Sequence, residues 1–423
     1  MRSLALLLIV GCGGGTTAGP DAAPTANPTR EVVDTGLALD VTAKTGVATL
    51  QLGAGDFGAT LEVGDLQIDA VTDPDGNAIA FAAHDAKLDL ALAGDAGPIA
   101  IAYHYKLHEG FQGISKDGYS LIWPYFCGNM FPCHSEPADG TTFSSIAITG
   151  VPSGQVAVVP PTLTIAPSYQ VAFALGTYTE LPVGATTAGT QVSMWYRTPA
   201  EQTAATKGSA NLVAAVDWFE TTLGPYRFGP KLGGVPVTWG FTGNGGMEHH
   251  PFWHIAAPSL ASEETNVHES AHAWFGDGIR IACWEDFVLS EGTVSYLAGR
   301  ALEVVAPTVG ATIWQAYTTE LSTIAGTELV WPDSCGVVDI EKDHLFTDAP
   351  YMRGAFFYRA VALKTSAALV DQALHTFFVA HQGGAAKMAD MLTTLKDVTG
   401  YDPTTCAQMW LRDTTIPAIG PCP

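Results

Sequence analysis

The stretch "NVHESAHAWF" at residues 266–275 contains two histidines four residues apart, His268 and His272, with Glu269 beside the first. Residues four apart on an α-helix lie on one face, so both imidazoles can offer a nitrogen to one point in space. Two such nitrogens and one carboxylate form a three-ligand set for Zn²⁺ and leave a fourth position for water. Glu291, at the start of the next apolar run with helical spacing, is well placed to be the third ligand.

Burial of this segment favours the metal site over the alternative, in which these side chains are ordinary polar groups on a surface helix. Only 14% of the residues are charged, and Val267, Ala271 and residues 273–275 make the predicted helix mostly apolar. Buried imidazoles and carboxylates need partners, and one zinc ion per chain would satisfy them. The H-E-x-x-H pattern is also a general signature of zinc proteases, although it arises by chance in unrelated proteins.

Composition limits the classes of function. At 423 residues with 47% hydrophobic residues, the chain is long enough for two or three folded domains. The formal net charge of -23 makes binding to nucleic acid or to an anionic membrane surface unfavourable. We therefore expect a globular protein with no nucleic-acid partner.

The first residues predict export. The apolar run at 4–10 is too short to span a bilayer, so residues 1–11 are interpreted as a signal peptide. Residues 9–12, "IVGC", resemble the lipobox of bacterial lipoproteins, in which the signal is cut before the cysteine, here Cys12, and that cysteine is acylated. Residues 12–30 would be a flexible tether. The alternative is an ordinary secretory signal, so we expect a protein that is lipid-anchored in the cell envelope or secreted, with no other membrane contact.

The other six cysteines would lie in an oxidising compartment, where disulfides are stable. Proximity in the chain favours the pairs Cys127–Cys133, Cys283–Cys335 and Cys406–Cys422. Sequence alone leaves the other pairings open.

Hydrophobic periodicity divides the remaining chain into two parts. Residues 31–202 contain short runs that alternate apolar with polar or small residues between turn-forming residues, which predicts a β-sandwich or curved two-sheet domain. Residues 203–423 carry apolar residues at helical spacing, which predicts a mainly helical domain. The expected fold class is α+β multidomain.

Four segments in order resemble the M1-type gluzincin aminopeptidases. They are "GGMEH" at 245–249, "HESAHAWFGD" at 268–277, "WEDFVLSEGTVSYL" at 284–297 and "PYMRGA" at 350–355. The resemblance implies a saddle-like N-terminal β domain and a thermolysin-like catalytic domain. No segment after these resembles the family's β-sandwich and helical-repeat C-terminal domains, so we expect a short form.

The resemblance also implies catalytic roles. His268, His272 and Glu291 would hold zinc, which lowers the pKa of bound water towards about 7. Glu269 would act as general base towards that water and then as general acid towards the leaving amine. Tyr351 would donate a hydrogen bond to the oxyanion of the tetrahedral intermediate.

Substrate recognition is implied in the same way. Glu248 matches the family residue that binds the free α-amino group of the substrate, and Gly245, Gly246 and Met247 match the backbone beside it. We therefore expect an exopeptidase whose partners are peptides with a free N-terminus. Many family members have a second amine-binding glutamate at a position where an ungapped count places Trp123. Either the alignment has a gap here, or the protein holds the ammonium group mainly through Glu248.

Other polar residues near the predicted metal ligands are expected to support the site rather than to bind the metal. Asp286 and Ser295 lie close to Glu291 in the sequence, and we expect them to contact the metal ligands. Three further histidines are expected to be structural, because the ligand set is complete without them: His249, His250 and His254.

Two other functions fit parts of this pattern. A thermolysin-like endopeptidase shares the two histidines and the distal glutamate, but the "GGMEH" segment disfavours it. A non-catalytic, zinc-containing peptide-binding lipoprotein would need neither Glu269 nor Tyr351. A zinc-dependent aminopeptidase is therefore the leading interpretation.

Overall fold

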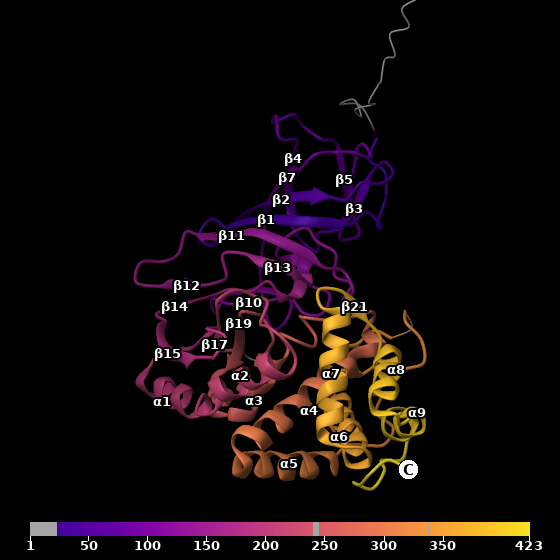
Figure 1. Ribbon diagram of the computed structural model, residues 1–423. Coiled ribbons are helices and arrows are strands. Elements are labelled where there is room, and N and C mark those ends of the chain that lie inside the picture. Colours follow the sequence, from indigo (N-terminus) through magenta and orange to yellow (C-terminus); the bar gives the residue numbers. More distant parts are fainter. Residues whose placement is uncertain (1–22, 240–244, 337) are drawn as a thin grey trace, which may run out of the picture.

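The computed structural model describes residues 23–239, 245–336 and 338–423. Figure 1 shows a β-rich N-terminal half at the top and a mainly helical C-terminal half below it. The α+β fold class predicted from the sequence is confirmed. Cys12 and the predicted signal peptide lie outside the described residues.

Two sheets form the upper part. In the larger sheet, strand β2 (Thr45–Leu52) alternates buried with more exposed residues. Its side chains Ala48, Leu50 and Leu52 face the core, which gives this sheet one apolar face. The six-stranded sheet has the order β13 (Leu163–Ala166), β11 (Thr141–Thr149), β1 (Val32–Asp40), β2 (Thr45–Leu52), β7 (Ile99–His104) and β4 (Gln67–Thr72). The three-stranded sheet has the order β3 (Ala59–Glu62), β6 (Lys87–Leu90) and β5 (Phe81–His84).

Seven further short strands in the described part of the chain form three small sheets of two or three strands each. They are β8 (Leu107–His108), β9 (Gly113–Ser115), β10 (Ser120–Leu121), β12 (Val156–Val158), β14 (Ala174–Gly176), β20 (Arg280–Ile281) and β21 (Ala385–Ala386).

A five-stranded sheet supports the helical part. Its order is β15 (Thr179–Ala185), β16 (Gln191–Tyr196), β17 (Lys231–Val237), β19 (Phe252–Ala256) and β18 (Gly246–Met247). Because β16 pairs in parallel with β17, the first two strands belong to this sheet. Two strands that precede residue 202, the boundary expected from the sequence, thus share a sheet with strands that follow it.

Nine α-helices are present among the described residues. They are α1 (Pro199–Gly208), α2 (Leu212–Thr222), α3 (Glu263–Ala271), α4 (Phe287–Val305), α5 (Pro307–Leu321), α6 (Asp348–Lys364), α7 (Ala367–His381), α8 (Met388–Thr399) and α9 (Thr404–Ala407). The Ser262 hydroxyl caps the start of α3 by accepting a hydrogen bond from Thr265 N at 3.1 Å. None of the described helices is long and apolar enough to cross a membrane.

A pair of glycines lets α4 and α6 pack unusually closely. A Cβ atom added at Gly292 on α4 would lie 2.7 Å from the Cα of Gly354 on α6. Since that neighbour is backbone, it could not move aside without shifting a helix. This contact joins the two helices close to two predicted site residues, since Glu291 directly precedes Gly292 and Tyr351 lies one helical turn before Gly354.

The three predicted disulfides are confirmed. The Sγ–Sγ distances are 2.02 Å for Cys127–Cys133, 1.99 Å for Cys283–Cys335 and 2.01 Å for Cys406–Cys422. The second bond ties the segment after α5 to the start of α4, beside the site described next.

Candidate metal centre and active site

Helix α3 presents both predicted imidazoles to one point. His268 lies in its last turn and His272 directly after its end, and the two Nε2 atoms are 3.3 Å apart. His272 Nδ1 lies 3.0 Å from the carbonyl oxygen of Phe275, which can only accept a hydrogen bond. That contact places the proton on Nδ1 and leaves Nε2 with a free lone pair for a metal ion.

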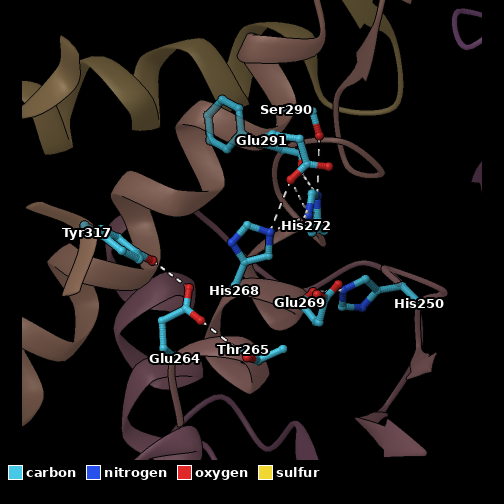
Figure 2. A network of polar contacts seen from close by, with 10 residues as sticks. His250, Glu264, Thr265, His268, Glu269, His272, Ser290, Glu291 and Tyr317 are labelled. Carbon is cyan, nitrogen blue, oxygen red and sulfur yellow. Dashed lines mark hydrogen bonds and ion pairs between the residues drawn. The ribbon is translucent and has the colours of Figure 1, made fainter. Parts of the chain in front are cut away.

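Glu291 on α4 completes the group, as Figure 2 shows. Its Oε2 lies 3.2 Å from His268 Nε2 and 3.4 Å from His272 Nε2. Burial acts to raise the pKa of this carboxyl, but the two imidazoles lower it by more, to about 2. The result is a buried carboxylate with two imidazole nitrogens converging on one point, and this donor set fits Zn²⁺.

Glu269 lies beside this group and belongs to the same cavity. The side chain is 5% exposed. A Cβ atom at Gly246 on β18 would overlap the Glu269 carboxylate, so the absence of a side chain there lets the strand lie against this group. Burial raises the pKa of Glu269 well above its usual range, against the opposing effect of His272. A carboxyl with a raised pKa is suited to gaining and losing a proton near neutral pH.

A cavity of about 480 Å³ connects these groups with the remaining predicted residues. Carboxylate oxygens of Glu248 and Glu269 and a nitrogen of His272 all lie within 4.8 Å of one another. Every predicted metal, catalytic and substrate-binding residue lines this cavity: Gly245, Gly246, Met247, Glu248, His268, Glu269, His272, Glu291 and Tyr351.

Tyr351 comes from the first turn of α6. Its ring stacks on the His268 imidazole with centroids 5.9 Å apart and an interplanar angle of 19°. Phe287 packs edge-on against the other side at 5.9 Å. The stacking and the close packing of α4 and α6 hold the tyrosine at the rim of the metal site.

The expected supporting contacts are different in the structure. Asp286 does not contact the metal ligands; its Oδ1 accepts hydrogen bonds from Trp331 Nε1 at 3.1 Å and Met388 N at 2.9 Å. The residue that does contact a ligand is Ser290, whose Oγ lies 3.4 Å from His272 Nδ1. Its position directly before Glu291 is the only sequence signal that could have indicated it. Ser295 lines the cavity, and its buried hydroxyl has no hydrogen-bond partner among the described residues.

The position where the family resemblance suggests a second amine-binding carboxylate carries an indole. Trp123 lines the cavity and packs against Phe346 at 4.7 Å and Phe111 at 5.9 Å between ring centroids. Trp123, Phe346 and Phe111 therefore form an aromatic wall of the cavity. Sequence reasoning missed Phe111 and Phe346, because both lie in connecting segments without a recognisable pattern.

The three additional histidines are buried and lie outside the group that converges at Glu291. His250 Nε2 lies 2.8 Å from the backbone oxygen of Glu269, and its Nδ1 lies 3.1 Å from the Tyr226 hydroxyl. His254 packs against His249 with ring centroids 4.6 Å apart. This arrangement agrees with the structural role expected for them.

These buried imidazoles should make stability fall in acid. Burial lowers the pKa of His254 from 6.5 to about 3. Between these two pH values the unfolded chain binds a proton at this residue, whereas the folded chain does not. The free energy of unfolding should therefore decrease as the pH falls from 6.5 towards 3, by up to about 1.4 kcal/mol per pH unit for this residue. Denaturant titrations over this pH range should show that the free energy of unfolding depends less steeply on pH in His254→Gln than in the unmodified protein. His84→Gln is the control, because a hydrogen bond with Asp89 raises the pKa of that exposed histidine. An unchanged slope in His254→Gln would contradict the assignment.

Comparison with known proteins agrees with the motifs. Residues 256–410 match the family model described as "Peptidase family M1 domain". Aminopeptidase N of Streptomyces lividans is 25% identical over 165 residues, which cover 37% of this chain and 19% of that protein. Aminopeptidase M1-D of Oryza sativa subsp. japonica is 24% identical over 328 residues, which cover 69% of this chain and 36% of that protein. The chain thus spans well under half the length of these relatives.

Solved structures show the same fold over nearly the whole chain. The M1 zinc metallopeptidase from Deinococcus radiodurans superimposes with a TM-score of 0.76 at 20% identity, covering 93% of this chain and 95% of that chain. A two-domain M1 zinc metallopeptidase bound to L-arginine gives a TM-score of 0.77 at 21% identity, covering 92% and 96%.

The chain has the fold of the two-domain M1 zinc metallopeptidases and contains a buried His–His–Glu group. The match to the model of the M1 peptidase family, over residues 256–410, includes this His–His–Glu group.

Proposed function

We propose that this protein is a zinc-dependent aminopeptidase that hydrolyses the N-terminal bond of peptides. The observation that supports this most strongly is the position of Glu248. Its carboxylate lies in the same cavity as the His268, His272 and Glu291 donor set, within 4.8 Å of His272 and Glu269. A carboxylate at that distance from the reaction site can hold the α-ammonium group, which lies two bonds from the carbonyl carbon of the peptide bond that is cleaved.

One zinc ion per chain, held by His268, His272 and Glu291, would supply Lewis acidity and lower the pKa of bound water. Glu269 accepts the proton of the attacking water and then donates it to the leaving amine, a contribution of about 10²- to 10⁴-fold. Its burial stabilises the neutral, protonated form between these two transfers. The Tyr351 hydroxyl donates a hydrogen bond to the oxyanion as charge develops there.

Glu248 selects substrates by their charge. Burial raises the pKa of this carboxyl, which means that its ionised form lacks sufficient compensation in the cavity. A substrate ammonium supplies that compensation, whereas an acetylated N-terminus leaves the carboxylate without a partner. Gly245, Gly246 and Met247 line the cavity beside it.

A comparison of free and blocked substrates tests the proposed activity. Zinc-loaded protein should cleave a leucyl amide and leave its N-acetyl form intact, and removal of the metal with a chelator should abolish cleavage until zinc is restored. Internal cleavage of an acetylated peptide would indicate an endopeptidase instead. Zinc binding without turnover of any peptide would indicate a binding protein.

We also propose that the protein is exported and anchored to the cell envelope through an acylated Cys12. The alternative is a secreted protein without this lipid anchor. The three disulfides support an oxidising compartment. Mass analysis of the mature N-terminus would show whether the chain begins at a lipid-modified Cys12.

A further inference from the structure

Three carboxylates that the proposed reaction does not use line one end of the cavity. They are Glu264 on α3, Glu320 on α5 and Asp348 at the start of α6. Among the described residues, no lysine or arginine forms an ion pair with any of them. Burial and the facing carboxylates of Asp348 and Glu264 raise the pKa of Glu320 to about 7. This end of the cavity therefore has uncompensated negative charge.

Contacts within the protein hold this charge in place. The Tyr317 hydroxyl donates a hydrogen bond to Glu264 Oε1 at 2.6 Å, and the Thr265 hydroxyl lies 3.3 Å from Oε2. Glu320 follows Tyr317 by one turn of α5. Figure 2 shows Glu264 and Tyr317 on the opposite side of His268 from Glu269. These contacts hold the Glu264 carboxylate between α3 and α5, and α5 and α6 carry Glu320 and Asp348.

The position of Glu264 along α3 indicates which part of a bound peptide would lie at this end of the cavity. Glu264, His268 and His272 follow one another at intervals of four residues, so they form a row along one face of the segment. Glu248 is at the His272 end of this row. A peptide with its α-amino group on Glu248 and its first carbonyl at the metal ligands directs its second residue towards Glu264.

A second feature indicates a polar ligand in the same cavity. Ser295, one turn after Glu291 on α4, is 1% exposed and lines the cavity. Its hydroxyl oxygen has no hydrogen-bond partner among the described residues. A buried hydroxyl without a partner is costly, and a bound peptide backbone would supply one.

We propose that Glu264, Glu320 and Asp348 form an acidic subsite that selects peptides with lysine or arginine as the second residue. This inference rests on the proposed aminopeptidase function. The long apolar stem of such a side chain would pass the metal ligands, and its cationic end would hydrogen-bond to the carboxylates.

Two tripeptides that differ only in this charge test the subsite. Leu-Lys-Gly and Leu-norleucine-Gly have second side chains of similar length, and kcat/KM for release of leucine is measured for each with zinc-loaded protein. We expect a preference of about tenfold or more for lysine, the size of a hydrogen bond to a charged group. Glu264→Gln and Glu320→Gln should each lower the ratio, and the double variant should bring it close to one.

Asp397→Asn is the matched control, because it removes the same charge from an exposed position on α8 outside the cavity and should leave the ratio unchanged. Equal cleavage of both peptides by the unmodified protein would overturn the acidic subsite and leave the aminopeptidase function intact. An equal loss of preference in the Asp397 variant would also overturn it, since net charge alone would then explain the effect. If neither peptide is cleaved, the proposed function fails and this subsite fails with it.

Discussion

Replacing Glu269 by glutamine is expected to lower kcat for a leucyl amide by about 10²- to 10⁴-fold while zinc remains bound. Glutamine keeps the size of the side chain, which is 5% exposed and lies against Gly246, so the cavity should keep its shape. An amide cannot accept the proton of the attacking water. Steady-state kinetics together with the zinc content of the purified variant measure both parts of the expectation.

The zinc measurement is decisive because the site contains two overlapping donor groups. Besides His268, His272 and Glu291, polar atoms of Glu248, Glu269 and His272 also lie within 4.8 Å of one another. If Glu269→Gln loses zinc together with activity, Glu269 is a ligand and its assignment as the base is wrong. Glu263→Gln is the control on the same helix, since the Glu263 carboxylate accepts a hydrogen bond from Asn211 at 2.6 Å and does not line the cavity.

Replacing Glu248 by glutamine should weaken recognition of the free amino group by about ten- to a hundredfold in kcat/KM, as for other hydrogen bonds between charged groups. The carboxylate is buried at the His272 end of the cavity, where an ammonium group without a counter-charge would be strongly destabilised. The loss is measured with a leucyl amide and with its α-hydroxy analogue, which has no positive charge.

The two substrates separate charge recognition from general damage. The unmodified protein should prefer the amine over the hydroxy compound strongly, and Glu248→Gln should lose most of this preference while retaining its zinc. A variant that keeps the full preference would show that another group binds the amine. Trp123 cannot take this role by ion pairing, because its indole carries no charge.

The convergence of His268, His272 and Glu291 could be predicted from sequence because its information is local. His268 and His272 are four residues apart in an apolar segment, and the next apolar segment brings Glu291 to them. Disulfide pairing was also predictable, because each cysteine has its partner nearest in the chain. Both inferences depend on residues that are neighbours of their kind along the chain, the widest pair being Cys283 and Cys335 at a separation of 52 residues.

Features that depend on distant parts of the chain could not be predicted. The strands β15 and β16 alternate like those before them, and only pairing with β17 assigns them to the second part. Asp286 is close to Glu291 in sequence, yet its carboxylate is directed to α8 by a bond with Met388 N. Phe111 and Glu320 reach the cavity from elements far apart in the chain, so no local pattern indicates them.

The contact between Gly292 and Gly354 has a consequence for how this protein tolerates change. Neither glycine takes part in the proposed chemistry, but Glu291 is the immediate neighbour of one and Tyr351 lies one helical turn before the other. A single methyl group at either position would push the two helices apart and move the Glu291 carboxylate away from the Tyr351 ring. Gly292 and Gly354 thus set the separation of the two helices at the site. We expect substitutions at these glycines to be tolerated as poorly as substitutions of Glu291 and Tyr351.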